Sequence, residues 1–134
     1  MNLLLDTHIL LWVLADTKKL SKTSRCMIYE AEHVFFSPIN LWEIGIKTSI
    51  WTEYNIQHVE DIYAGALKTH LTELTVTSAD TMLASQLPLI HRDPFDRVLI
   101  AQSHNNRCHL LTVDSKIIQY QMPYIIQLWV HDCM

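Results

Sequence analysis

Acidic side chains stand where a catalytic or metal-binding centre could be built. Asp6 directly follows the apolar run of residues 3–5, and Asp114 follows the run of residues 110–113. A carboxylate at a strand end would project into the crevice where open α/β sheets bind ligands, and hard divalent cations prefer oxygen ligands. Capping of the following helix is a sufficient structural explanation for each aspartate. One such junction alone is therefore weak evidence for a site.

Three further acidic residues stand in expected helices or at the start of one. In the segment D-P-F-D-R of residues 93–97, Asp93 would be the N-cap and Asp96 the third helical residue, which favours a helix start without any chemistry. Glu43 could simply pair with Lys47 four residues later. Glu43 also stands beside the expected apolar face of its helix, where a carboxylate requires a cation or another partner.

Signatures of other catalytic chemistries are absent. The histidines have neither H-x-x-x-H nor H-E-x-x-H spacing, so structural roles are the default even for His8 and His91, which lie near the expected site. Two glycines cannot form a Gly-rich phosphate loop, and there is no G-x-S-x-G elbow or Cys-His signature. Three widely spaced cysteines suit neither a disulfide framework nor a zinc site. Carboxylate chemistry remains.

The elements that must position these acids alternate between strand and helix. Strand composition occurs at residues 2–5, 34–36, 73–76, 109–113 and 124–130. Helical patterns occur at residues 7–15, 21–31, 38–50, 56–71, 78–87, 95–106 and 115–120. The apolar face of the 38–50 helix is expected to consist of Ile39, Trp42, Ile46 and Ile50. This alternation predicts one α/β/α sandwich domain with a mainly parallel central sheet of short strands.

Composition and charge limit the classes of partner. A net charge of −4 argues against a broad basic surface for nucleic acid, so any such contact must use a local patch. The longest apolar stretches are too short to cross a bilayer, and the N-terminus lacks the features of a signal peptide. We therefore expect a cytoplasmic protein that makes no use of a membrane.

Four segments carry a family resemblance. They read L-L-L-D-T-H at residues 3–8, S-P-I-N-L-W-E-I at 37–44, H-R-D-P-F-D-R at 91–97 and L-T-V-D at 111–114. Together and in this order they resemble the PIN-domain family, particularly the VapC-type toxins of bacterial toxin–antitoxin pairs. The resemblance implies a PIN domain over residues 1–130, followed by a tail of residues 131–134. Asn40 departs from the pattern, because many relatives have a small hydroxyl residue there.

The resemblance implies a metal-dependent endoribonuclease that hydrolyses RNA phosphodiesters. By position in the motifs, Asp6, Glu43, Asp96 and Asp114 match the family's catalytic and metal-binding acids, and Asp93 matches an accessory acid. One or two Mg²⁺ or Mn²⁺ ions would offset the repulsion among these carboxylates. In a two-metal scheme one ion activates a water and the other stabilises the leaving oxygen. Glu43 would be a ligand or would orient that water.

The implied partners are RNA and protein. Arg97, Lys47 and Arg92 are candidates for binding RNA phosphates, and an ion pair with a neighbouring acid is the alternative for Arg97. The family implies a cognate small antitoxin and a homodimer. The helix of residues 7–15 is apolar nearly all round, which fits either burial of both faces or a groove for a partner.

Two other functions stay open on the sequence. A haloacid-dehalogenase-like phosphatase also begins with an aspartate after its first strand, but it requires a second aspartate where this chain has His8. A non-catalytic PIN-like module that binds RNA or protein would use the acids only for structure. It predicts that no metal binds and that Asp96→Asn changes stability without changing any activity.

Overall fold

The computed structural model describes residues 1–90, 92–120, 122 and 124–127. Strands and helices alternate along the chain, as the sequence predicts. They are β1 (Asn2–Leu5), α1 (Thr7–Ala15), η1 (Thr17–Lys19), α2 (Lys22–Glu30), β2 (His33–Phe36), α3 (Pro38–Ile46), η2 (Thr52–Tyr54), α4 (Val59–Lys68), β3 (Thr72–Glu73), α5 (Ser78–Gln86), α6 (Pro94–Asn106), β4 (His109–Thr112), α7 (Ser115–Ile118) and β5 (Ile125–Gln127).

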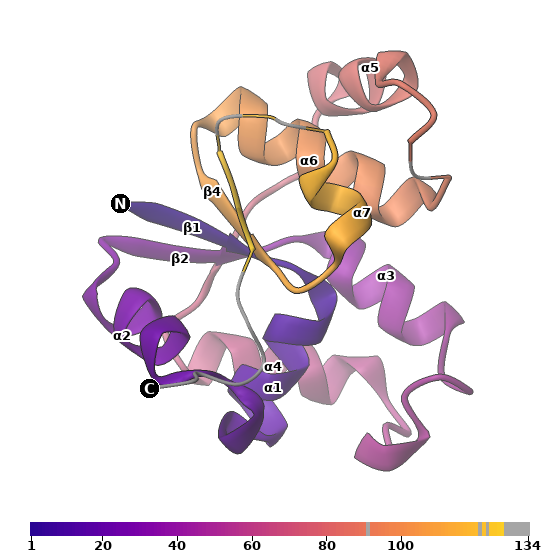
Figure 1. Ribbon diagram of the computed structural model, residues 1–134. Helices are drawn as coiled ribbons and strands as arrows, with labels where there is room; N and C mark the ends of the chain where they lie inside the picture. The colour runs from indigo at the N-terminus through magenta and orange to yellow at the C-terminus, as the bar shows by residue number, and fades with distance from the viewer. Residues whose placement is uncertain (91, 121, 123, 128–134) are drawn as a thin grey trace.

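A five-stranded sheet in the order β3-β2-β1-β4-β5 forms the middle layer (Figure 1). Every neighbouring pair of strands runs parallel. The chain builds outward from β1 to β3 on one side and then crosses to β4 on the other. This change of direction opens a crevice beyond the carboxyl ends of β1 and β4, where open α/β sheets bind ligands. Asp6 and Asp114 stand at that edge.

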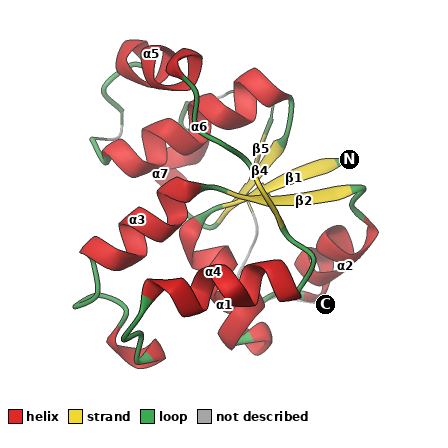
Figure 2. Ribbon diagram, turned by 180° about the vertical axis from the view of Figure 1, so that it is seen from behind, coloured by secondary structure: helices red, strands yellow, loops and turns green. Residues whose placement is uncertain are grey.

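Helices cover both faces of the sheet, with α1 and α4 on one face and α6 and α7 on the other (Figure 2). Leu3 and Leu5 of β1 pack into the core on the α1 side, whereas Leu4 packs into the core beneath α6. All three side chains are fully buried. Successive strand residues point to opposite faces, so an uninterrupted apolar run is what a strand buried on both sides requires.

The composition of α1 reflects burial in the chain's own core. Four consecutive residues of this helix are buried: Ile9, Leu10, Leu11 and Trp12. The helix contacts α3 and α4 as well as β1 and β4 of the sheet. Burial within the fold therefore accounts for a helix that is apolar on nearly every side.

Helix α3 buries a different face from the one predicted from its apolar residues. Trp42 and Ile46 are 60% and 57% exposed, and the helix ends at Ile46. The buried residues of this helix are Ile39, Asn40, Glu43 and Ile44. Asn40 and Glu43 can be buried because both have hydrogen-bond partners, which offset the free-energy cost of removing a polar group from water. Of the predicted face only Ile39 is buried, and Glu43 lies on the buried face itself.

Helix α4 is shorter than the span of residues 56–71 predicted for it. It starts at Val59 and ends at Lys68. The backbone of His70 has a φ of 65°, in the left-handed region, so the helix cannot continue through it. The chain turns there and enters the short strand β3.

Within the residues that the structure describes, no helix is long and apolar enough to cross a bilayer. The strand predicted over residues 124–130 is present as β5. Its last residues, 128–130, and the proposed tail of residues 131–134 lie outside the described part of the chain.

Candidate active site

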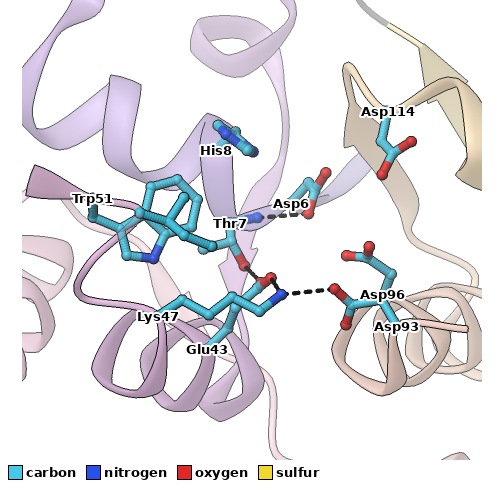
Figure 3. Close-up of a pocket in the computed structure, with 10 residues that line it drawn as sticks. Asp6, Thr7, His8, Glu43, Lys47, Trp51, Asp93, Asp96 and Asp114 are labelled. Carbon is cyan, nitrogen blue, oxygen red and sulfur yellow. Dashed lines mark hydrogen bonds and ion pairs between the residues drawn. The ribbon is translucent and has the colours of Figure 1, made fainter.

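A pocket of about 150 Å³ lies at the carboxyl ends of β1 and β4 (Figure 3). Its lining residues are Asp6, Thr7, His8, Glu43, Lys47, Ile50, Trp51, Asp93, Asp96 and Asp114. Half of them are acidic, and these include all four acids that the sequence assigns to catalysis together with the accessory acid. The fold therefore brings the five proposed acids into one pocket.

Three of the five acids are also helix N-caps. Asp6, Asp93 and Asp114 each accept a backbone N–H through Oδ1, at the starts of α1, α6 and α7, at distances of 2.7, 2.9 and 2.9 Å. The second oxygen of Asp6 accepts from the Thr112 hydroxyl at 2.7 Å, and that of Asp93 accepts from the Lys47 ammonium at 2.7 Å. Capping and lining the pocket are thus not alternatives. One oxygen of the carboxylate can serve each purpose.

Asp6 is almost fully buried in the wall of the pocket. Burial raises the pKa of Asp6 to about 6. The hydrogen bonds from Thr112 and Thr7 oppose this rise because they favour the charged form. The nearby carboxylates of Glu43 and Asp114 add to the rise. Hydrogen bonds therefore orient the Asp6 carboxylate, but they do not cancel the rise in its pKa that burial and the neighbouring acids cause.

Glu43 reaches the pocket from the buried side of α3. Its Oε1 accepts from the Thr7 hydroxyl at 2.5 Å, and the Thr7 oxygen in turn accepts from Nδ2 of Asn40 at 3.0 Å. Asn40 also donates to the carbonyl of Leu5 and accepts from the backbone N–H of Ser37 in the capping box of α3. These bonds tie the start of α3 to the end of β1 and fix the carboxylate of Glu43.

Lys47, at the C-cap of α3, connects two of the acids. Its ammonium donates to Oε2 of Glu43 at 2.9 Å and to Oδ2 of Asp93 at 2.7 Å. Burial lowers the pKa of Lys47, but the hydrogen bonds to Asp93 and Glu43 outweigh it and raise the pKa above its ordinary value. The ammonium therefore stays charged and bridges α3 and α6 (Figure 3).

Asp96 lies in the first turn of α6 and is 6% exposed. Burial, together with the negative charges of the other four pocket acids, raises the pKa of Asp96 to about 9. Burial is the larger cause and the neighbouring carboxylates add to it, so a cation bound beside Asp96 would favour the charged form of this carboxyl.

The donor set fits a hard divalent cation. Carboxylate oxygens of Glu43, Asp93 and Asp96 lie within 4.8 Å of one another. Mg²⁺ and Mn²⁺ prefer such oxygen ligands. A bound cation would also relieve the repulsion that raises the pKa of Asp96. The residues present therefore fit the metal that the sequence resemblance implies.

Arg97 and Arg92 are not among the residues that line the pocket. Arg97 is buried, and its guanidinium donates to the carbonyls of Ala84 and Leu87 at 2.7 and 2.8 Å and to that of Pro88 at 2.9 Å. These bonds join the end of α5 to the start of α6. Arg92 is exposed. The neighbouring position, 91, lies outside the described residues.

Two residues of the pocket, Thr7 and Trp51, are not among those predicted from the sequence. Thr7 could have been noticed as a hydroxyl residue directly after the strand-end Asp6. Trp51 is 3% exposed, and its Nε1 has no hydrogen-bond partner among the described residues. Its ring packs edge-to-face against the ring of His8, with 4.7 Å between the two ring centroids. The sequence holds no signal for Trp51, because its position depends on the turn after α3.

Comparison with known proteins addresses the family directly. The family model described as the PIN domain matches residues 3–121. A search of curated proteins found no match.

Solved structures with a similar fold cover nearly the whole chain. VapBC2 from Rickettsia felis, bound to a DNA fragment from its promoter, has a TM-score of 0.64 at 14% identity and covers 95% of this chain and 97% of that chain. A toxin–antitoxin complex from Klebsiella pneumoniae has a TM-score of 0.63 at 13% identity, over 92% and 94% of the two chains. FitAB bound to an IR36 DNA fragment has a TM-score of 0.60 at 15% identity, over 93% and 94%. At these identities the likeness concerns the fold alone.

Proposed function

The chain belongs to the PIN domain family, and on that premise we propose that it is a metal-dependent endoribonuclease and the toxin of a toxin–antitoxin pair. The observation that carries the nuclease proposal is the convergence of five carboxylates on one pocket, in which the pKa of Asp96 is raised to about 9. The toxin proposal is supported by the similar folds of VapBC2 and of the Klebsiella pneumoniae toxin–antitoxin complex.

We assign Asp6, Asp96 and Asp114 as ligands of Mg²⁺ or Mn²⁺, with Asp93 as an accessory acid and Glu43 as a further ligand or the group that orients the attacking water. The bound metal, one or two ions, would lower the pKa of that water and stabilise the leaving oxygen. The chain's own hydroxyls position the acids. Thr112 holds Asp6 in place.

RNA phosphates need positive charge near a pocket that is itself negative. Of the three basic residues that the sequence suggests, we assign this role to Arg92, which is exposed and adjoins Asp93. Lys47 already donates to Glu43 and Asp93. Arg97 already donates to backbone carbonyls of the α5 end. We therefore place these two in the support of the site.

A protein partner is supported by apolar side chains exposed beside the pocket. Trp42 and Ile46 of α3 and Ile50 in the following turn are each more than half exposed, and Ile50 also lines the pocket. Large exposed apolar groups of this kind mark interaction surfaces. We propose that the chain, as a PIN domain over residues 1–130, pairs with a small cognate antitoxin, forms a homodimer and acts in the cytoplasm.

The test of catalysis is cleavage of a labelled mixed RNA pool by purified protein. We expect cutting with Mg²⁺ or Mn²⁺, none with EDTA and none with Asp96→Asn. Asp16→Asn is the matched control, because the Asp16 side chain makes no capping hydrogen bond and lies outside the pocket. If folded wild-type protein leaves the RNA intact in both metals, the nuclease assignment is wrong.

The test of toxicity is bacterial growth when the protein is produced without a partner. Wild-type protein should slow growth, and Asp6→Asn protein at equal abundance should not. Equal inhibition by both would show that catalysis is not the cause.

A further inference from the structure

His8 and Trp51 line one side of the pocket with rings instead of carboxylates. Figure 3 shows both of them on one side, with Asp96 and Asp114 on the other. Ile50, which is more than half exposed, also lines the pocket and precedes Trp51 in the chain. The metal chemistry proposed above uses none of these three residues, His8, Ile50 and Trp51, which together form an aromatic patch.

The imidazole ring of His8 is exposed and yet held in place. It packs edge-to-face against the ring of Trp51, with 4.7 Å between the centroids, and against the ring of Trp12 at 5.9 Å. Trp51 and Trp12 are themselves only 3% and 7% exposed, so the core fixes both indoles. A ligand that stacks on the free surface of the His8 ring therefore costs little in lost side-chain freedom.

Binding of RNA through phosphate contacts alone would work against the charge of this pocket. Five of its ten lining residues are acidic, and its one ammonium, that of Lys47, already donates to Glu43 and Asp93. The chain as a whole has a net charge of −4. Nucleobases are uncharged at neutral pH, and unpaired bases stack on aromatic side chains, histidine included. Contacts to a base therefore suit this pocket better than further contacts to phosphate.

The aromatic patch lies where a base next to the bound phosphate would be. Asp6 caps α1, and His8 is in the first turn of the same helix, two positions later. Both residues line one pocket of about 150 Å³, so a base on the His8 ring belongs to a nucleotide that adjoins the phosphate at the acids. In duplex RNA each base is paired and stacked between its neighbours, and it cannot reach such a ring.

We propose that His8 is a nucleobase-binding residue of this pocket and that Trp51 and Trp12 position its ring. The base belongs to one of the two nucleotides joined by the phosphodiester that is cut, and it must be unpaired. The proposal rests on the nuclease function above. His8 contributes binding and no proton transfer, so the reaction depends on its ring and not on its nitrogens.

The first test measures cleavage, with Mn²⁺, of the RNA that is cut most strongly in the mixed pool. We expect His8→Ala to raise KM about 5- to 20-fold, as loss of one base-stacking side chain does, and to leave kcat within about twofold. His8→Phe keeps a ring and should bring KM back to within a few-fold of wild type. His104→Ala is the matched control, because His104 is an exposed histidine of α6 outside the pocket, and it should equal wild type.

The second test removes the base. The same RNA is made with an abasic site on the 5′ side or on the 3′ side of the cut. One of these two RNAs should raise the KM of wild-type protein by about the same factor as His8→Ala does. His8→Ala protein should show no further rise with that RNA, because the two changes remove the same contact.

A third measurement does not depend on cleavage. A short oligouridine with one central 2-aminopurine is titrated with protein in Ca²⁺, a hard cation that carboxylate oxygens also bind. The fluorescence of 2-aminopurine falls when the base stacks. We expect quenching by wild-type protein and by His8→Phe, and none by His8→Ala.

An unchanged KM in His8→Ala, or a loss of kcat that His8→Phe shares, would overturn the role of His8 in binding a base. Effects of His8→Ala and of the abasic site that multiply would do the same, since independent groups behave in that way. If wild-type protein cuts no RNA, the nuclease proposal fails and the 2-aminopurine titration decides the base site alone. Quenching that His8→Ala lacks would support the site, and no quenching by wild-type protein would overturn it.

Discussion

The two walls of the pocket differ in the groups that contact their acidic side chains. Asp6 and Asp114, which follow β1 and β4, form the strand wall, and Thr112 behind it is one of the neutral donors that hold Asp6. Asp6 accepts from a backbone N–H and a hydroxyl, and burial raises its pKa to about 6 although these two hydrogen bonds oppose the rise. The helix wall contains a full positive charge, because Lys47 lies between Glu43 and Asp93.

The comparison separates orientation from neutralisation. Neutral donors aim a carboxylate without removing the repulsion between it and the next one. The ammonium of Lys47 removes part of that repulsion at Glu43 and Asp93, whereas burial, with the neighbouring carboxylates adding to it, raises the pKa of Asp96 to about 9. Asp6, Glu43 and Asp93 are therefore oriented by groups of the protein itself, and we expect a divalent cation to favour the charged form of Asp96.

The largest effect is expected from the strand wall. Thr112→Val removes the hydroxyl that donates to Asp6 and keeps the shape of a fully buried side chain. Loss of a group that orients a metal ligand typically weakens metal binding about 10- to 100-fold. We expect a fall of that size in Mn²⁺ affinity measured by calorimetry. Thr112→Ser retains the hydroxyl and should stay within a few-fold of wild type. Equal affinities in Thr112→Val and wild type would mean that neutral donors do not orient Asp6 for metal.

A smaller effect should follow from cutting the link between the two walls. Thr7→Val removes the hydroxyl that donates to Glu43 and accepts from Asn40. Leaving buried polar groups without this partner should cost about 2 kcal/mol in the free energy of unfolding. Urea denaturation in EDTA measures it, with Thr7→Ser as the variant that keeps the bond. A Thr7→Val protein as stable as wild type would show that the walls are held independently.

The smallest effect concerns pH and tests the raised pKa of Asp96 on the helix wall. The folded protein keeps the Asp96 proton up to a pKa of about 9, against 3.8 for an ordinary aspartate. Between these values the folded state binds more protons than the unfolded state, so metal-free protein loses stability as pH rises. We expect the free energy of unfolding in EDTA to fall by about 1 kcal/mol between pH 7 and pH 8.

Asp96→Asn is the control for this pH dependence and should lack most of the fall. Saturating Mg²⁺ should also flatten the dependence for wild-type protein, because the ion replaces the proton. Identical pH dependence in wild type and Asp96→Asn would contradict the strongly raised pKa.

Local rules were sufficient for much of the fold. Leu3, Leu4 and Leu5 are apolar without interruption because the central strand is buried on both sides, and that pattern is visible in the sequence. Asp6 and Asp93 could be recognised as N-caps from their neighbours alone, and the structure confirms both. The same local rules left the choice between cap and site open. They could not show that in Asp6 and Asp93 one carboxylate oxygen caps a helix while the other accepts a hydrogen bond from a different side chain.

Long-range contacts decided what the sequence could not. The buried face of α3 was predicted wrongly because periodicity counts apolar residues, whereas Asn40 and Glu43 are buried through bonds to a segment more than 30 positions earlier. Lys47 and Arg97 look alike in sequence, since each adjoins a site motif. Lys47 faces carboxylates and Arg97 faces carbonyls of α5. The packing of α6 against both α3 and α5 distinguishes them.

The order of strands also has a consequence during synthesis. β1 is made first, but it lies in the middle of the sheet and pairs with β4, and the bond between Thr112 and Asp6 joins residues 106 positions apart. A chain that is still growing on the ribosome from its N-terminus therefore contains Asp6 long before the pocket can form. The pocket is completed only after Asp114 has emerged, so a shorter nascent fragment lacks the complete set of pocket acids.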